Sequence, residues 1–195
     1  DVLKTVQENE GVDIVTPMKD MKNQLAARLK ANLPNQDEAV FHMANLLINI
    51  KLGFRPPLGP SGVLAIAGSS APQRAAAVAI LAKAIFGNAD NVTIFDASKL
   101  ASEEAARAFL EGRPVEGVPS LQDALAKRPT PFLFFQRPDR AAPALAEGLR
   151  EAIDRGRVKT PAGERIEFTR SLLFYGFDVP ASASQTAMEV RNALR

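Results

Sequence analysis

The fold of this chain is decided by residues 63–86, which read VLAIAGSSAPQRAAAVAILAKAIF. The apolar run 63–67 predicts a buried strand, residues 68–75 predict a loop, and residues 75–86 predict an apolar helix. This strand–loop–helix order is the setting of a Walker A phosphate-binding loop. The pattern of that loop is glycine, four residues, then Gly-Lys followed by Ser or Thr.

Only the first residue of that pattern, Gly68, is present here. Gln73 stands in place of the second glycine, Arg74 in place of the lysine, and Ala75 in place of the hydroxyl residue. Alanine cannot ligate Mg²⁺, and a glutamine side chain lies where the backbone must approach phosphate. We therefore predict a vestigial phosphate loop that has lost hydrolysis. Its residues are Gly68, Ser69, Ser70 and Arg74.

The alternative is a loop that still binds an anion. Arg74 is permanently charged and can make two-pronged contacts with phosphate. Pro72 argues against tight binding, because it removes one backbone amide from the loop. The expected cofactor is therefore none, with ATP and Mg²⁺ as the alternative.

The composition is that of an ordinary globular domain. The chain has 195 residues, of which 46% are hydrophobic and 24% charged, with a net charge of +2. Such a balance indicates neither a nucleic-acid nor a membrane partner. The absence of cysteine excludes disulfides and a thiol nucleophile, and a single histidine leaves little material for a catalytic triad. We interpret the chain, which starts at Asp1, as a piece of a larger cytoplasmic protein.

Strand and helix patterns alternate after residue 62, which predicts an α/β fold with a mostly parallel sheet covered on both faces. The predicted strands are 63–67, 92–95, 132–135 and 172–177, and the predicted helices are 75–86, 102–110, 120–127 and 141–155. Upstream, we expect a helix over 19–29 and a second helix capped by Asn35, with Glu38 completing a capping box. The breaker-rich run 53–62 predicts a loop, and residues 156–168 predict a β-hairpin.

Several segments together resemble the large α/β subdomain of Clp-family AAA+ unfoldases and disaggregases, specifically their second ATPase module. Residues 35–40 (NQDEAV) resemble the G-Q-D-E-A-V segment, and residues 154–158 (DRGRV) resemble D-D-G-R-L. Residues 162–168 (AGERIEF) resemble the G-Q-G-R-x-V-D-F hairpin, and the sequence from Lys127 to Phe135 resembles the lead-in and strand of Walker B. The likeness covers about residues 10–180. It implies a three-layer αβα sandwich of the P-loop NTPase class with a small β-hairpin.

The same comparison shows where this chain departs from the family. The Walker B carboxylates are replaced by Gln136 and Arg137, and arginine neither accepts a proton nor coordinates a cation. Asp178 occupies the position of the sensor-1 asparagine, where it would place negative charge near the γ-phosphate. Residues 111–117, at the position of the substrate-gripping pore loop, contain no aromatic residue. The resemblance also implies that Asn35 and Gln36 mark a vestigial adenine edge.

These departures favour a catalytically inactive AAA+ module that serves as a structural or protein-interaction element of a chaperone-like protein. A divergent ATP-binding or ATP-hydrolysing chaperone module is the alternative, and a passive nucleotide sensor is a third hypothesis. The expected partners are another protein or other modules of the same polypeptide, with a homo-oligomeric ring for the full-length protein. We expect three parts: a lead-in and helix (1–34), the large subdomain (35–180), and the start of a C-terminal helix or linker (181–195).

Overall fold

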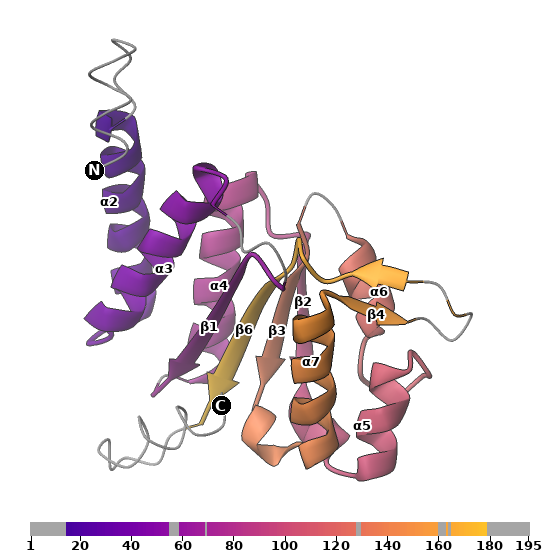
Figure 1. Ribbon diagram of the computed structural model, residues 1–195. Coiled ribbons are helices and arrows are strands. Elements are labelled where there is room, and N and C mark those ends of the chain that lie inside the picture. Colours follow the sequence, from indigo (N-terminus) through magenta and orange to yellow (C-terminus); the bar gives the residue numbers. More distant parts are fainter. Residues whose placement is uncertain are drawn as a thin grey trace.

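The centre of the fold is a parallel sheet of four strands (Figure 1). The computed structural model describes residues 15–54, 59–68, 70–127, 130–159, 163 and 165–178. The strands are β1 (Gly62–Ala67), β2 (Val92–Asp96), β3 (Phe132–Gln136) and β6 (Leu172–Phe177), in the spatial order β1-β6-β3-β2. All four predicted strands are confirmed, and their parallel pairing brings all four carboxyl ends to one edge of the sheet.

Alternate residues of the central strands point to opposite faces of the sheet, and both faces are apolar. Phe132 and Phe134 of β3 belong to one core cluster, whereas Leu133 and Phe135 belong to the other. All four side chains are fully buried. A strand that is apolar on both faces requires a helical layer on each side, which explains the three-layer arrangement.

Helices cover the two faces as the sequence pattern predicted. On one face lie α5 (Glu103–Leu110), α6 (Leu121–Ala126) and α7 (Pro143–Arg155), and on the other lies α4 (Ala71–Phe86). Each of these four predicted helices is present, and among them the largest difference in bounds is at the start of α4, which begins at Ala71. The three-layer αβα sandwich is therefore confirmed.

Two further helices pack outside α4 and add to the core on that side. They are α2 (Val15–Asn32) and α3 (Asp37–Lys51), which contribute buried leucines at positions 25, 29 and 47. The prediction that Asn35 caps the second helix is wrong. Asn35 adopts a left-handed conformation (φ 61°) in the turn before α3, and Gln36 is the N-cap without a side-chain cap hydrogen bond. Asparagine tolerates this backbone conformation better than most residues, so it serves the turn and leaves the cap position to its neighbour.

The predicted hairpin is formed by β4 (Arg157–Lys159) and β5 (Arg165–Glu167), which pair antiparallel. It packs beside α6 and α7. The predictions for residues 1–14, 128–129 and 179–195, and for the hairpin turn at Ala162, lie outside the described residues.

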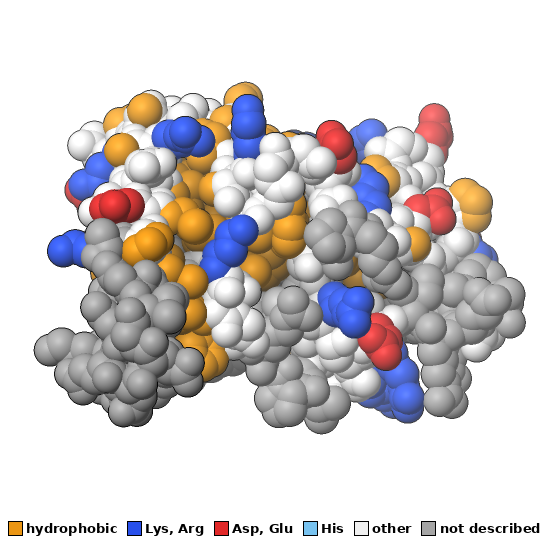
Figure 2. Space-filling model, turned by 90° about the horizontal axis from the view of Figure 1, so that it is seen from above, with side chains coloured by type: hydrophobic (Ala, Val, Ile, Leu, Met, Phe, Trp, Pro, Cys, Tyr) orange, Lys and Arg blue, Asp and Glu red, His pale blue; other side chains and the backbone are white. Residues whose placement is uncertain are grey.

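Charged side chains of both signs are scattered over the face at the amino ends of the strands (Figure 2). The same view shows a band of hydrophobic side chains left of centre, with isolated lysine and arginine side chains around it. Large apolar side chains are exposed at four described positions: Phe41, Phe54, Val63 and Ile94. Among the described residues, no helix is long and apolar enough to cross a membrane.

Tyr175, the single tyrosine of the chain, gives a direct probe of this core. Its ring stacks on Phe135 at 5.7 Å, and burial raises the pKa of its phenol from 10.0 to about 12. We predict that tyrosinate absorbance in the native protein rises with a midpoint well above 10.0, towards 12. Because the neutral phenol is favoured in the folded state, its stabilising contribution is complete below pH 10.0 and is lost as pH rises through about 12.

A relocated tyrosine provides the control for this titration. The double variant Tyr175→Phe, Phe41→Tyr moves the chromophore to an α3 position where the side chain is 56% exposed. Its absorbance should titrate near the ordinary tyrosine pKa of about 10. Identical midpoints for the two proteins would contradict the burial of Tyr175.

Candidate functional site

The candidate site lies at the carboxyl ends of the strands, where ligands bind in open α/β sheets. Gly68 follows β1 with a φ of 84°, a conformation that favours glycine, and Ser70 is the N-cap of α4. The helix begins at Ala71, so the predicted loop 68–75 is wrong over its second half. Pro72 in the first turn and the Ser70 cap start the helix early, because both residues favour a helix N-terminus. Ser69 lies outside the described residues.

A capping box occupies amide donors at the start of α4. The Ser70 amide donates to Gln73 Oε1 at 3.0 Å, and the Gln73 amide donates to Ser70 Oγ at 3.4 Å. The Ser70 hydroxyl also donates to Gln73 Oε1, at 2.9 Å. Amides at a helix N-terminus are the donors that normally hold a phosphate. Here the Gln73 side chain occupies the Ser70 amide and the Ser70 side chain occupies the Gln73 amide, so both donors bond within the chain.

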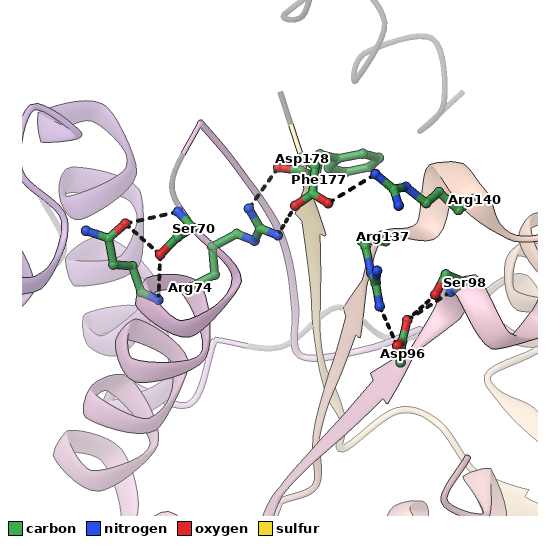
Figure 3. Close-up of polar contacts among 9 residues, drawn as sticks. Ser70, Arg74, Asp96, Ser98, Arg137, Arg140, Phe177 and Asp178 are labelled. Atoms are coloured by element: carbon green, nitrogen blue, oxygen red, sulfur yellow. Dashed lines mark hydrogen bonds and ion pairs between the residues drawn. The ribbon is translucent and has the colours of Figure 1, made fainter. Parts of the chain in front are cut away.

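Arg74, at the position of the Walker A lysine, is directed towards the end of β6 (Figure 3). The side chain is 0% exposed. Its Nη1 donates to the carbonyl oxygen of Phe177 at 3.1 Å, and its Nη2 lies 2.6 Å from Asp178 Oδ1. Gly176 leaves room for this path, since a Cβ there would lie 2.8 Å from Arg74 Nε. The guanidinium is therefore committed to contacts within the chain.

Asp178, at the sensor-1 position, lies between two arginines. One carboxylate oxygen contacts Arg74, and the other lies 3.6 Å from Nη2 of Arg140 in the short helix η2 (Pro138–Arg140). The Asp178 side chain is 41% exposed, so this group forms the boundary between the buried arginine and solvent. Any anion approaching the strand ends meets a carboxylate that already neutralises the arginine at the lysine position.

The Walker B positions contribute a second ion pair. Gln136 ends β3 and is half-buried, while Arg137 adopts a left-handed conformation with a φ of 55°. That conformation costs roughly 1–2 kcal/mol for a residue with a side chain. The Arg137 amide donates to the Gly176 carbonyl at 2.8 Å, and its guanidinium forms a short ion pair with Asp96. The Arg137 side chain, 30% exposed, is therefore both in contact with solvent and paired with Asp96.

Asp96 ends β2, and its carboxylate accepts two hydrogen bonds from Ser98. Its Oδ1 accepts the Ser98 amide at 3.1 Å and the Ser98 hydroxyl at 2.6 Å. Burial alone would raise the pKa of this carboxyl, but the Ser98 hydrogen bonds and the Arg137 charge lower it below 3.8. The carboxylate is thus charged at neutral pH and paired with an arginine, which makes it an anchor for β2 and β3.

The structure brings one of the two predicted adenine-edge residues to the site. Nε2 of the Gln36 side chain lies 3.1 Å from the position that a Cβ on Gly68 would take, so this side chain lies beside the phosphate-loop position. Asn35 belongs to the turn before α3. Residues 111–117 lie elsewhere, against α6 and the short helix η1 (Ala97–Leu100), where Lys99 Nζ donates to the Gly117 carbonyl at 3.1 Å.

The predicted positions 68, 70, 74, 136, 137 and 178 all lie at this edge of the sheet, but the sequence did not predict how their side chains pair. The opposite charges at positions 74 and 178, where the family pattern has lysine and asparagine, were the signal for the first ion pair. The roles of Ser98, Arg140 and the Phe177 carbonyl had no comparable signal, since they depend on where loops place single atoms. Within the described residues, no three His, Asp or Glu side chains come together as a metal-ion site.

The parallel sheet between two helical layers matches the AAA+ P-loop NTPase fold of Hsp104, and the sequence is similar to those of Clp chaperones. The predicted resemblance to a Clp-type AAA+ module is confirmed by the relatives and by the solved structure that the chain matches. No family model matches the chain.

Two curated relatives and one solved structure make this similarity specific. The chain is 24% identical over 190 residues to chaperone protein ClpB of Mycoplasma genitalium, covering 89% of this chain and 27% of the relative. It is 23% identical over 168 residues to the ATP-dependent Clp protease ATP-binding subunit ClpE of Lactococcus lactis, covering 80% and 22%. A closed-state reconstruction of Hsp104 with ATPyS and FITC casein matches with a TM-score of 0.72 at 19% identity, covering 100% of this chain and 37% of that one. The chain thus spans about a quarter of the length of these curated relatives.

The Asp96–Arg137 pair predicts a pH dependence of stability. A carboxyl whose pKa is lowered in the folded state stabilises the fold above its unfolded pKa, and this contribution is lost as pH falls through the folded value. We predict that Asp96→Asn lowers the Tm by a few degrees at about pH 6 and that the difference from wild type shrinks at about pH 3. Thermal unfolding followed by circular dichroism measures both.

Asp139→Asn, at an exposed residue of η2, is the matched control for this charge removal. It should change the Tm little at either pH. A constant difference between wild type and Asp96→Asn across the acid range would contradict the ion-pair account.

Proposed function

We propose that this chain is a catalytically inactive Clp-like AAA+ module that serves as a structural or protein-interaction element of a larger, chaperone-like cytoplasmic protein. The observation that carries this proposal is the path of Arg74. The one cation that replaces the phosphate-binding lysine is fully buried and bonded to Phe177 and Asp178. In this position the guanidinium serves the fold and is unavailable to a γ-phosphate.

The other side chains at the strand ends support the same conclusion. A Mg²⁺–nucleotide site of this class needs a hydroxyl at the start of the helix and a carboxylate at the end of the Walker B strand. Ala75 and Gln136 supply neither, and Arg137 brings a positive charge to the second position. The residues present therefore do not fit Mg²⁺–ATP.

The preserved fold explains what such a module still offers. Both core faces are filled by large apolar side chains, so the sequence still specifies a packed α/β domain. A folded module without turnover can hold a neighbouring module or a partner protein in a fixed geometry. We propose that its partners are other modules of the same polypeptide or a second protein, and that the full-length protein assembles as a ring.

The first prediction from this proposal concerns nucleotide. The 195-residue chain should release no phosphate from ATP above a protein-free blank, and Mg²⁺–ATP should shift its Tm by less than about 1 °C. A ligand present at a hundred times its Kd would add about 2.7 kcal/mol of stability, which corresponds to a shift of several degrees. Mg²⁺-dependent turnover that disappears in Arg74→Ala would establish the divergent ATPase instead.

The second prediction concerns restoration of the loop. Gln73→Gly frees the Ser70 amide, Arg74→Lys restores the cation, and Ala75→Thr supplies the Mg²⁺ ligand. The triple variant should gain an ATP-induced rise in Tm and still show no turnover, because no carboxylate replaces Gln136 or Arg137. Calorimetric titration with Mg²⁺–ATP measures the gain, and Ala75→Thr alone is the control.

Failure of the triple variant to bind ATP would place the loss in the backbone. Pro72 and the early start of α4 would then exclude the phosphate whatever side chains are present.

A further inference from the structure

One side chain joins three separate parts of the fold at the strand ends. Arg74 belongs to α4, its guanidinium contacts the last residue of β6 and Asp178, and Asp178 in turn contacts Arg140 of η2 (Figure 3). In the Clp-type modules that this chain resembles, the matching positions are the Walker A lysine and the sensor-1 asparagine. Both positions have changed here, and the two new side chains carry opposite charges.

The buried guanidinium needs a negative partner to exist in this position. A charge removed from water is costly unless it is paired and hydrogen-bonded. Arg74 is 0% exposed, and the chain supplies both an anion, at 2.6 Å, and a carbonyl oxygen, at 3.1 Å. The carboxylate takes the role that a bound phosphate would otherwise have, as counter-charge at the start of α4.

We propose that the Arg74–Asp178 ion pair is a built-in substitute for an anionic ligand, which holds α4 against the end of β6 without nucleotide. The inference deepens the proposed function and rests on it. It means that the inactive site keeps α4 next to the end of β6 at all times, with no ligand required. Gly176 is part of the device, since any larger residue there would meet the guanidinium at 2.8 Å.

A double-mutant cycle tests whether the two side chains act as a unit. Arg74→Met and Asp178→Asn are each expected to lower the Tm by roughly 5–10 °C, because each leaves the other partner of a partly buried pair uncompensated. The double variant should lose clearly less than the sum of the two single losses. The exposed pair Arg113–Glu111, whose Nε and Oε2 atoms lie 2.9 Å apart, is the matched control. Its cycle (Arg113→Met, Glu111→Gln) should be additive, with shifts within about 2 °C.

Chemical replacement of the lost carboxylate tests the counter-charge directly. Asp178→Ala removes the anion and opens the approach to Arg74. Sodium formate should raise the Tm of Asp178→Ala by several degrees relative to sodium chloride at the same ionic strength. Replacing sodium chloride by sodium formate should change the Tm of wild type and of Glu111→Ala by less than about 1 °C.

The outcomes separate this inference from the proposed function. An additive Arg74/Asp178 cycle, or equal responses of Asp178→Ala to formate and chloride, would overturn the internal-ligand role and leave the absence of turnover intact. ATP turnover by the unaltered chain would overturn the proposed function whatever the cycle shows. A coupled cycle together with selective stabilisation by formate supports the inference.

Discussion

A buried positive charge constrains the whole strand-end region of this protein. The Arg74 guanidinium is removed from water, so a carboxylate and a carbonyl must come to it from the end of β6. That requirement fixes the first turn of α4 relative to the sheet and keeps position 176 a glycine. It also determines the charge that an incoming ligand would meet, because Asp178 forms the exposed side of the pair.

The second ion pair at this edge also joins an arginine to a carboxylate, but both side chains are less buried. Arg137 and Asp96 are about one third exposed, and they join the ends of β3 and β2. Arg137 holds an unfavourable left-handed backbone while its amide donates to the carbonyl of Gly176. Position 176 therefore lies next to both arginines: its missing side chain leaves space for Arg74, and its carbonyl accepts the backbone amide of Arg137. The strand ends thus carry two ion pairs that both lie beside the backbone of Gly176.

The resemblance to Clp-type modules concerns the fold of the chain, whereas the two ion pairs concern the side chains at the strand ends. The resemblance rests on the fold, on the hairpin and on the order of the motifs, and it is confirmed by relatives at 23–24% identity. The ion pairs include three residues at which this chain departs from the family pattern: Arg74, Arg137 and Asp178. A fold can persist after its chemistry is lost, since core packing depends on hydrophobic pattern and a catalytic site depends on a few particular atoms.

The sequence by itself determined the architecture, because periodicity in apolar residues is a local property that reports which faces must be buried. The strands at 92–96 and 132–136, the helix α7 and the hairpin were all predicted close to their observed bounds. Local reasoning failed at Asn35 and at the start of α4, where several nearby residues could serve as the cap. Only the tertiary structure decided the direction of Arg74 and its pairing with Asp178, which lies 104 positions away. A side chain's partner across such a separation depends on how strands align in the sheet, and that alignment exists only after folding.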